Sequence, residues 1–299
     1  MTESARPEPK PESEPESWSA EPEGPMEPGQ GGRTRDRWRP PGLIKASIAF
    51  HGALAAGTIA YPEHWPTALK LLAANHAVVG LAGMLPRASW LGRTVNRFPT
   101  RTDACRPEVA LTFDDGPDPE VTPQVLDLLD AHGAQASFFC IGRRVEQYPE
   151  LTREIVQRGH LVENHTFHHS HSFAFRLYGG LKREILRAQD AIEGTTGRRP
   201  SYFRAPAGMR NFFLDPLLRH LDLTLVAWTR RGFDAVEGNP DRVLPRLVRG
   251  LSAGDILLLH DGNSAKNAKG KPVAIESLSR LLALFDRRGL AAVTLPPGL

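Results

Sequence analysis

Cysteine is nearly absent from this chain of 299 residues, which contains only Cys105 and Cys140. Two cysteines do not provide the disulfide framework that stabilises many small secreted domains, so a buried core has to do so instead. Cys140 lies in the apolar stretch "ASFFCIG". We interpret it as a small buried apolar side chain rather than as a reactive thiol.

Large apolar residues are nearly absent from the first 30 residues, which contain eight Glu and seven Pro. With two basic residues, this segment carries a charge of −6, whereas the whole chain carries +3 and the remainder therefore about +9. A segment of this kind cannot bury a core. Residues 1–40 are predicted to be a disordered tail that is first acidic and Pro-rich and then basic.

The chain also lacks a basic stripe interleaved with aromatic residues, and aromatic residues make up only 7% of it. The positive excess consists largely of Arg beside apolar segments. Nucleic acid is therefore not expected among the partners of this protein.

Two apolar runs of 19 residues each, 43–61 and 67–85, follow the tail and are separated by the polar break "PEHWP". This length is about that of a helix that spans a bilayer. Each run carries a Lys near one end, which can extend to the membrane surface. Each also has a His near its middle, which weakens the membrane interpretation.

Arginines lie before the first run and after the second, and the loop that joins the runs has neither Lys nor Arg. We therefore predict an apolar helical hairpin over 41–86, and the positive-inside rule places both of its ends in the cytoplasm. We expect it to associate with the inner membrane through residues 43–85, with the following domain in the cytoplasm. Two soluble helices packed on the main domain are an alternative, and a single span would place the domain in the periplasm. About 40 residues precede the first run, so we do not expect a cleaved signal peptide.

Short apolar runs alternate with amphipathic stretches in residues 104–299, after a predicted linker over 87–103. The strand pattern "EVALTF" precedes the helix pattern "TPQVLDLLDAHG", and "DILLLHD" precedes "AIESLSRLLALFDRRG". Such alternation predicts a parallel sheet covered by helices, either open or closed into a barrel. Active sites in these folds lie at the carboxyl ends of the strands.

Five polar clusters fall at the predicted strand ends: "TFDDGP", "ENHTFHHSHSF", "FRAPAG", "WTRRGFD" and "LLLHD". Because successive strand residues face opposite sides, one of Asp114 and Asp115 could bind a cation while the other lies beside water. Turn chemistry alone would also explain this pair.

His165 and His169 could lie on one side of a turn, and two imidazoles with a carboxylate suit zinc and leave a position open for water. A solvated His-rich loop would explain these two residues equally well. His260, which closes an apolar strand, could be structural. The coincidence of all five clusters at the strand ends favours an active site.

These motifs, in this order, resemble the polysaccharide deacetylase family, which is the NodB homology domain of carbohydrate esterase family 4. The resemblance covers roughly residues 104 to 297. It implies a distorted (β/α)7 barrel that removes N-acetyl groups from an amino-sugar-containing polysaccharide, oligosaccharide or lipid-linked precursor. It also implies a divalent metal, usually zinc with cobalt or nickel as alternatives, bound by Asp115, His165 and His169.

The same resemblance assigns further roles in the reaction. Asp114 would be the general base, Arg204 would orient Asp114, and His260 would be the general acid. The backbone N–H of Ala207 would contribute to the site for the oxyanion.

The chain departs from the family pattern in two motifs. Ala207 replaces an aromatic residue, so a wall on which a sugar would stack is missing. Around Trp228 and Asp234, Arg231 replaces an Asp and Ala235 replaces a Trp, so Trp228 and Arg231 are expected beside the substrate. Since the usual partner of the acid His is absent, either Asp234 or Asp261 could take that role, and we include Asp234 among the candidate catalytic residues.

An open leaving-group pocket with the added positive charge of Arg231 would suit a substrate with a phosphate or another anion. One alternative function is therefore deformylation of a sugar carried on a polyprenyl phosphate. Another is a membrane-tethered pseudoenzyme that binds carbohydrate without hydrolysing it.

Overall fold

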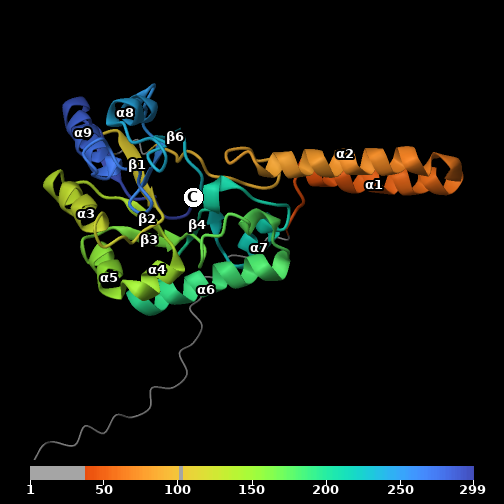
Figure 1. Ribbon diagram of the computed structural model, residues 1–299, viewed down its shortest axis with the longest axis horizontal. Helices are drawn as coiled ribbons and strands as arrows, with labels where there is room; N and C mark the ends of the chain where they lie inside the picture. Colours follow the sequence, from red (N-terminus) through yellow and green to blue (C-terminus); the bar gives the residue numbers. More distant parts are fainter. Residues whose placement is uncertain (1–37, 101–103) are drawn as a thin grey trace, which may run out of the picture. The chain divides into compact units, whose positions relative to one another are not determined.

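The computed structural model describes residues 38–100 and 104–299, so the tail predicted over 1–40 lies almost entirely outside the described residues. The described chain begins with two helices, α1 (Gly42–Ala60) and α2 (Trp65–Gly83), which a short turn of 3-10 helix (Pro62–His64) joins into a hairpin (Figure 1). Asn75 Nδ2 donates a hydrogen bond to Ser47 Oγ between the two helices (2.8 Å). Among the described residues, only α1 is both long and apolar enough to cross a membrane, and none of its residues is buried.

Eight strands form one curled parallel sheet in the order β5-β4-β3-β2-β1-β7-β6, and β8 pairs with the beginning of β1. Their bounds are β1 Glu108–Asp114, β2 Ser137–Cys140, β3 Leu161–Asn164, β4 Tyr202–Phe203, β5 Thr224–Leu225, β6 Arg230–Arg231, β7 Ile256–His260 and β8 Ala291–Val293. The distorted barrel expected from the sequence is thus confirmed. The central strands β1, β2 and β7 have apolar runs without polar alternation, because helices cover their outer face.

In the described part of the chain, the helices α3 to α9 surround this sheet (Figure 1). They are α3 Thr122–Ala131, α4 Gly142–Gln147, α5 Pro149–Gln157, α6 Tyr178–Thr196, α7 Leu214–His220, α8 Pro240–Val248 and α9 Val273–Arg288. The main core lies between the outer face of β1, β2 and β7 and the helices α3 and α9. Within it, the rings of Phe113 and Phe138 stack with their centroids 5.0 Å apart.

The apolar stretch "LTLVAWT" has the pattern of a strand, but only its first part forms one in the structure. β5 ends at Leu225, and the two-residue strand β6 follows at Arg230–Arg231. The carbonyl groups of Val226 and Ala227 accept hydrogen bonds from the guanidinium of Arg204 (3.3 and 3.0 Å). A buried side chain therefore occupies backbone groups that could otherwise continue a strand ladder.

Residues 87–100, which we expected to belong to a linker, pack against the sheet. Val95 forms a parallel bridge to Val226, and Arg97 forms an antiparallel bridge to Asp255. Val95 and Phe98 are buried, and the Arg97 guanidinium binds the Asp255 carboxylate. This segment therefore contributes to the core of the α/β domain.

Candidate active site

Asp114 and His260 occupy the carboxyl ends of the neighbouring strands β1 and β7. The two residues are register partners, so their side chains leave the sheet at the same level. Asp115 follows directly, with a backbone φ of 75°. Few residues other than glycine adopt this left-handed region, and strain of this kind tends to concentrate at functional sites.

Asp115, His165 and His169 form the one cluster of potential metal ligands found among the described residues. Asp115 Oδ1 lies 3.4 Å from His165 Nε2 and 3.1 Å from His169 Nε2. Together, the three ligand atoms lie within 4.8 Å of one another. One carboxylate and two imidazoles are a donor set that suits zinc and leaves room for other ligands.

The surroundings of this cluster fit a cation. Asp115 Oδ1 is buried, yet no hydrogen-bond donor in the described part of the chain reaches it with suitable geometry. His165 Nδ1 lies 2.8 Å from the carbonyl oxygen of Arg204, so Nδ1 carries the hydrogen and Nε2 presents its lone pair toward Asp115. A buried oxygen without a partner beside free imidazole lone pairs is costly unless a cation completes the site.

The protonation states of Asp115 and His169 favour binding of a metal, because metal ligands must be deprotonated. Burial lowers the pKa of His165, but the charges of Asp114 and Asp115 outweigh burial and raise it, so a metal would have to compete with a proton there. Burial raises the pKa of Asp115, but its interactions with His165 and His169 outweigh burial and hold that pKa well below its usual range. Burial and the neighbouring His165 lower the pKa of His169 to about 4. At neutral pH, Asp115 is therefore ionised and His169 is neutral.

Asp114 is held by the fully buried side chain of Arg204. Arg204 Nη1 donates to Asp114 Oδ1 (2.6 Å) and to Thr112 Oγ1 (2.9 Å). The guanidinium also lies over the ring of Phe139, 4.0 Å from its centroid. This charge-assisted hydrogen bond from a buried guanidinium fixes the orientation of the Asp114 carboxyl group. Asp114 Oδ2 lies 3.8 Å from His165 Nε2, beside the ligand cluster.

His260 is paired with Asp234. Asp234 Oδ2 accepts the backbone N–H of His260 (2.7 Å), and Asp234 Oδ1 lies 3.0 Å from His260 Nδ1. Burial alone would lower the pKa of His260, but the charge of Asp234 and its hydrogen bond outweigh burial and raise that pKa to about 9. The imidazolium is therefore protonated at neutral pH, and its Nε2–H is not engaged by Asp234.

Asp261, the other candidate partner for His260, points elsewhere. Its Oδ2 accepts a hydrogen bond from Thr122 Oγ1 (2.6 Å), and burial raises its pKa to about 7. The open question of which acid contacts His260 is therefore answered by the geometry, in favour of Asp234.

Ala207 and Trp228 lie in adjoining loops. Ala207 is exposed in the 3-10 turn Pro206–Gly208 and has a φ of 52°. No hydrogen bond to its N–H is formed within the described residues, so this group is available to a ligand. A side chain added at Gly208 would come within 2.9 Å of the Trp228 ring, which shows that Trp228 supports this turn.

Arg231 lies over two aromatic rings. Its guanidinium carbon is 5.3 Å from the centroid of Trp228 and 4.7 Å from that of Phe233. Its buried Nε has no hydrogen-bond partner in the described chain, and no carboxylate there forms an ion pair with it.

Two supporting residues of the site went unnoticed in the sequence. Asn263 Nδ2 donates to Asp115 Oδ2 (3.2 Å), and Asn164 Oδ1 accepts the N–H of Thr166 in the loop that carries both histidine ligands. His168, by contrast, turns away toward Glu184 (2.9 Å). Asn263 lies three residues after His260, so proximity to a strand-end cluster was a signal that could have identified it.

Comparison with known proteins gives a consistent result. A model of the family described as "Polysaccharide deacetylase" matches residues 101–226. The chain is 34% identical over 193 residues to a peptidoglycan-N-acetylglucosamine deacetylase of Bacillus cereus, covering 62% of this chain and 85% of that protein. It is 34% identical over 195 residues to a chitooligosaccharide deacetylase of Bradyrhizobium sp., covering 63% and 89%. Among solved structures, a family 4 carbohydrate esterase from Streptomyces lividans in complex with acetate aligns with a TM-score of 0.57 and 31% identity, covering 63% of this chain and 93% of that one.

Proposed function

The chain belongs to the polysaccharide deacetylase family, and we propose that it hydrolyses N-acetyl groups of an amino-sugar-containing saccharide at a metal held by Asp115, His165 and His169. The observation that carries this proposal is the arrangement of an orphaned carboxylate oxygen, two imidazoles, a clamped carboxylate and a protonated His around one edge of the sheet. Each component of an amide hydrolase is thereby accounted for by a residue of this chain.

A divalent cation such as zinc, when bound by these three residues, would polarise the amide carbonyl and make a water more acidic. Asp114, which Arg204 holds in place, accepts a proton from the water as the water oxygen adds to the carbonyl carbon. The N–H of Ala207 can donate to the oxyanion that forms. His260 then gives its Nε2 proton to the sugar nitrogen as the carbon–nitrogen bond breaks, releasing acetate and the free amine.

The test is release of acetate from a panel of N-acetylated saccharides, with zinc or cobalt added to the full chain. Asp115→Asn is the matched variant, because it keeps the size of the side chain and removes the charge that binds the metal. We expect acetate release and about one bound metal per chain for the wild type, and neither for the variant. Metal-bound wild-type protein that released no acyl group from any saccharide would refute the proposal.

Arg231 favours a second, related candidate substrate. Its guanidinium stacks on Trp228 and Phe233 but has no acidic partner among the described residues. A phosphate or another anion on the sugar itself would supply that partner, and a formylated sugar of this kind is the alternative substrate. Measuring formate as well as acetate in the same panel distinguishes deformylation from deacetylation.

We also propose that the hairpin associates with a membrane and that the α/β domain lies on the cytoplasmic side. The length and apolar composition of α1 and the positive charge outside the hairpin support this location. The test is a reporter that is active only in the cytoplasm, fused to the C-terminus. It would be active if both helices cross the membrane and inactive if only one does.

A further inference from the structure

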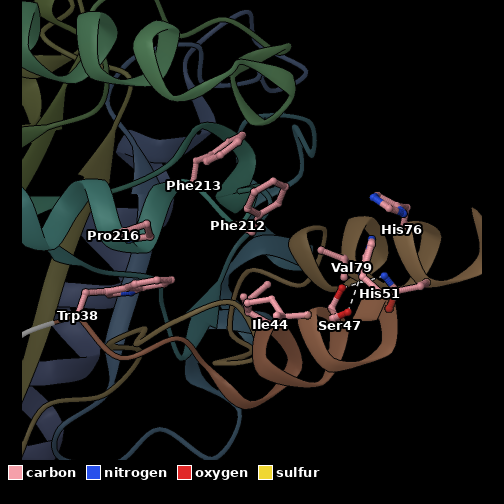
Figure 2. Close-up of a pocket in the computed structure, with 11 residues that line it drawn as sticks. Trp38, Ile44, Ser47, His51, His76, Val79, Phe212, Phe213 and Pro216 are labelled. Carbon is pink, nitrogen blue, oxygen red and sulfur yellow. Dashed lines mark hydrogen bonds between the residues drawn. The ribbon is translucent and has the colours of Figure 1, made fainter. Parts of the chain in front are cut away.

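Two apolar cavities lie where the helical hairpin meets the α/β domain. The first has a volume of about 560 Å³ and lies between residues of α1 and α2 and the domain residues Phe212, Phe213 and Pro216 (Figure 2). The second, of about 500 Å³, lies between the second half of α2 and the segments 174–175 and 209–212. Both are lined by His76, Val79 and Phe212, so we treat them as one continuous feature, the junction groove.

The junction groove adjoins the candidate active site through two loops. Ala174 and Phe175 follow the metal-ligand candidate His169 by five and six residues, and Met209 follows Ala207 by two. Asn211 Nδ2 donates to the carbonyl oxygens of Ala174 (2.9 Å) and Arg176 (2.8 Å), which ties the two loops together. The N–H of Arg210 donates to the carbonyl of Gly83 (3.0 Å), which ties them to α2.

The walls of the groove are unusually apolar for a surface in contact with water. Phe175 is 80% exposed, and Ile48 and Leu81 are each 62% exposed. Neither cavity has an acidic residue in its lining. A concave apolar surface of this size is typical of sites for small apolar ligands, and contiguous exposed apolar area is rare without a partner. A hydrocarbon chain has the matching chemistry, and α1 places such chains within reach if it lies in a membrane.

Arg210 provides a second, independent indication of the ligand. It lines the groove and is only 3% exposed, yet its Nε and Nη1 have no hydrogen-bond partner in the described chain. Its Nη2 donates to the carbonyl of Ala88. Asp215 acts on it electrostatically but makes no ion pair with it, because the two Asp215 oxygens accept hydrogen bonds from Trp38 and from the Arg93 backbone. Buried guanidinium donors without partners are costly, and a phosphate would satisfy them.

From these observations we infer that the junction groove binds the hydrocarbon chain of a lipid-phosphate-linked amino sugar, with its phosphate at Arg210 and its N-acyl group at the active site. This inference rests on the proposed function and specifies its substrate class. Arg210 lies three residues after Ala207, so the phosphate and the acyl group would be recognised by two ends of one short loop.

Filling the groove tests the inference. A side chain added at Gly80 of α2 meets nothing within 4 Å, and Gly80 lines the second cavity. Gly80→Phe would therefore occupy the groove without distorting the helix. Gly57→Phe on α1 is the matched control, because Gly57 is also helical and open but lines neither cavity. The substrates are one N-acetylated saccharide in two forms, as a water-soluble glycoside and linked to a polyprenyl phosphate, each presented to the full chain in detergent with zinc.

The quantity to compare is the ratio of kcat/KM for the lipid-linked form to kcat/KM for the soluble form. We expect this ratio to exceed ten for the wild type and for Gly57→Phe, and to fall at least tenfold in Gly80→Phe. Arg210→Met should remove the preference for the phosphate-linked lipid over the same saccharide on an uncharged alkyl chain, mainly through KM.

The outcomes separate the two proposals. If the metal-bound wild type releases no acyl group from either form, the proposed function itself is wrong. If the wild type hydrolyses both forms equally well, or if Gly80→Phe lowers kcat/KM for both equally, the proposed function stands and the inference about the groove is wrong. The inference about the groove would also be wrong if the groove retained bulk phospholipid while the ratio of the two kcat/KM values stayed unchanged in Gly80→Phe.

Discussion

Replacing Asp234 by Asn tests the role of His260 as the general acid. Asn retains an oxygen that can accept the hydrogen bond from His260 Nδ1, so the ring should keep its position. The variant removes the negative charge that contributes most to offsetting the burial of the imidazolium, together with the hydrogen bond that Asp234 Oδ2 accepts from the His260 backbone N–H. Because Nδ1 keeps its acceptor, the change should act mainly on the pKa of His260.

The expected magnitude follows from the environment of His260. Its pKa is about 9 in the structure, against an ordinary value of 6.5, and burial by itself lowers it. Asp234 makes the largest contribution that raises this pKa, and Asp114 and Asp115 make smaller ones. Loss of the Asp234 charge should therefore bring the pKa back toward 6.5, which is a loss of about 3 kcal/mol of imidazolium stabilisation. At pH 7.5, the protonated fraction then falls from nearly all to about one tenth, so kcat/KM should fall at least ~tenfold.

The assay is the pH dependence of kcat/KM for acyl release by the wild type and the variant, with the same metal in both. Because an acid must be protonated to act, activity is lost as pH rises through the pKa of His260. We expect the pH at which kcat/KM declines on the alkaline side to fall by about two pH units in Asp234→Asn. In the control Asp261→Asn it should stay in place, because Asp261 bonds to Thr122 instead. An unmoved alkaline limb in Asp234→Asn would refute the reasoning.

Three further predictions follow from the structure. Arg204→Met leaves Asp114 buried without its cation, so the free energy of unfolding should fall by about 3 to 5 kcal/mol in denaturant titrations; a loss below about 1 kcal/mol would contradict the buried pairing. Burial lowers the pKa of His160 to about 4. As pH falls below 6.5, this imidazole is protonated in the unfolded chain but not in the folded one, so the free energy of unfolding decreases from pH 6.5 toward pH 4. The unfolding free energy of the wild type should be lower at pH 4.5 than at pH 7, and His160→Gln should reduce this difference by about 2 kcal/mol. An identical pH dependence in both proteins would exclude the effect. Arg231→Ala should weaken kcat/KM for a phosphorylated saccharide at least ~tenfold more than for its neutral counterpart, and equal losses would show that Arg231 does not recognise an anion.

The long elements of the fold could be predicted from sequence because their apolar patterns are strong. β1 and β7 are continuous apolar runs, and α9 has an amphipathic pattern that ends at Gly289. β6 could not be predicted in this way, since it consists of Arg230 and Arg231 and pairs only through its backbone with β7.

The close approach of Asp114, His165 and His260 could also be anticipated, because parallel strands bring their carboxyl ends to one edge. The sequence left open which acid contacts His260, although the alternation of side-chain directions along a strand argues against Asp261. Asp261 directly follows His260 and therefore points to the opposite side, where it meets Thr122. Asp234 lies 26 residues upstream and reaches His260 only because the chain folds back beside β7.

The backbone at the site could not be predicted, because three of its residues adopt conformations that their side chains disfavour. Asp115, His169 and Ala207 have φ values of 75°, 53° and 52°, and none of them is glycine or asparagine. Each such residue costs roughly 1 to 3 kcal/mol, so neighbouring contacts must hold it in place. Asn263 holds the Asp115 carboxylate, and Thr166 Oγ1 accepts the N–H of His169 (3.0 Å). The fold thus maintains a strained backbone at these residues, which their local sequence preference does not favour.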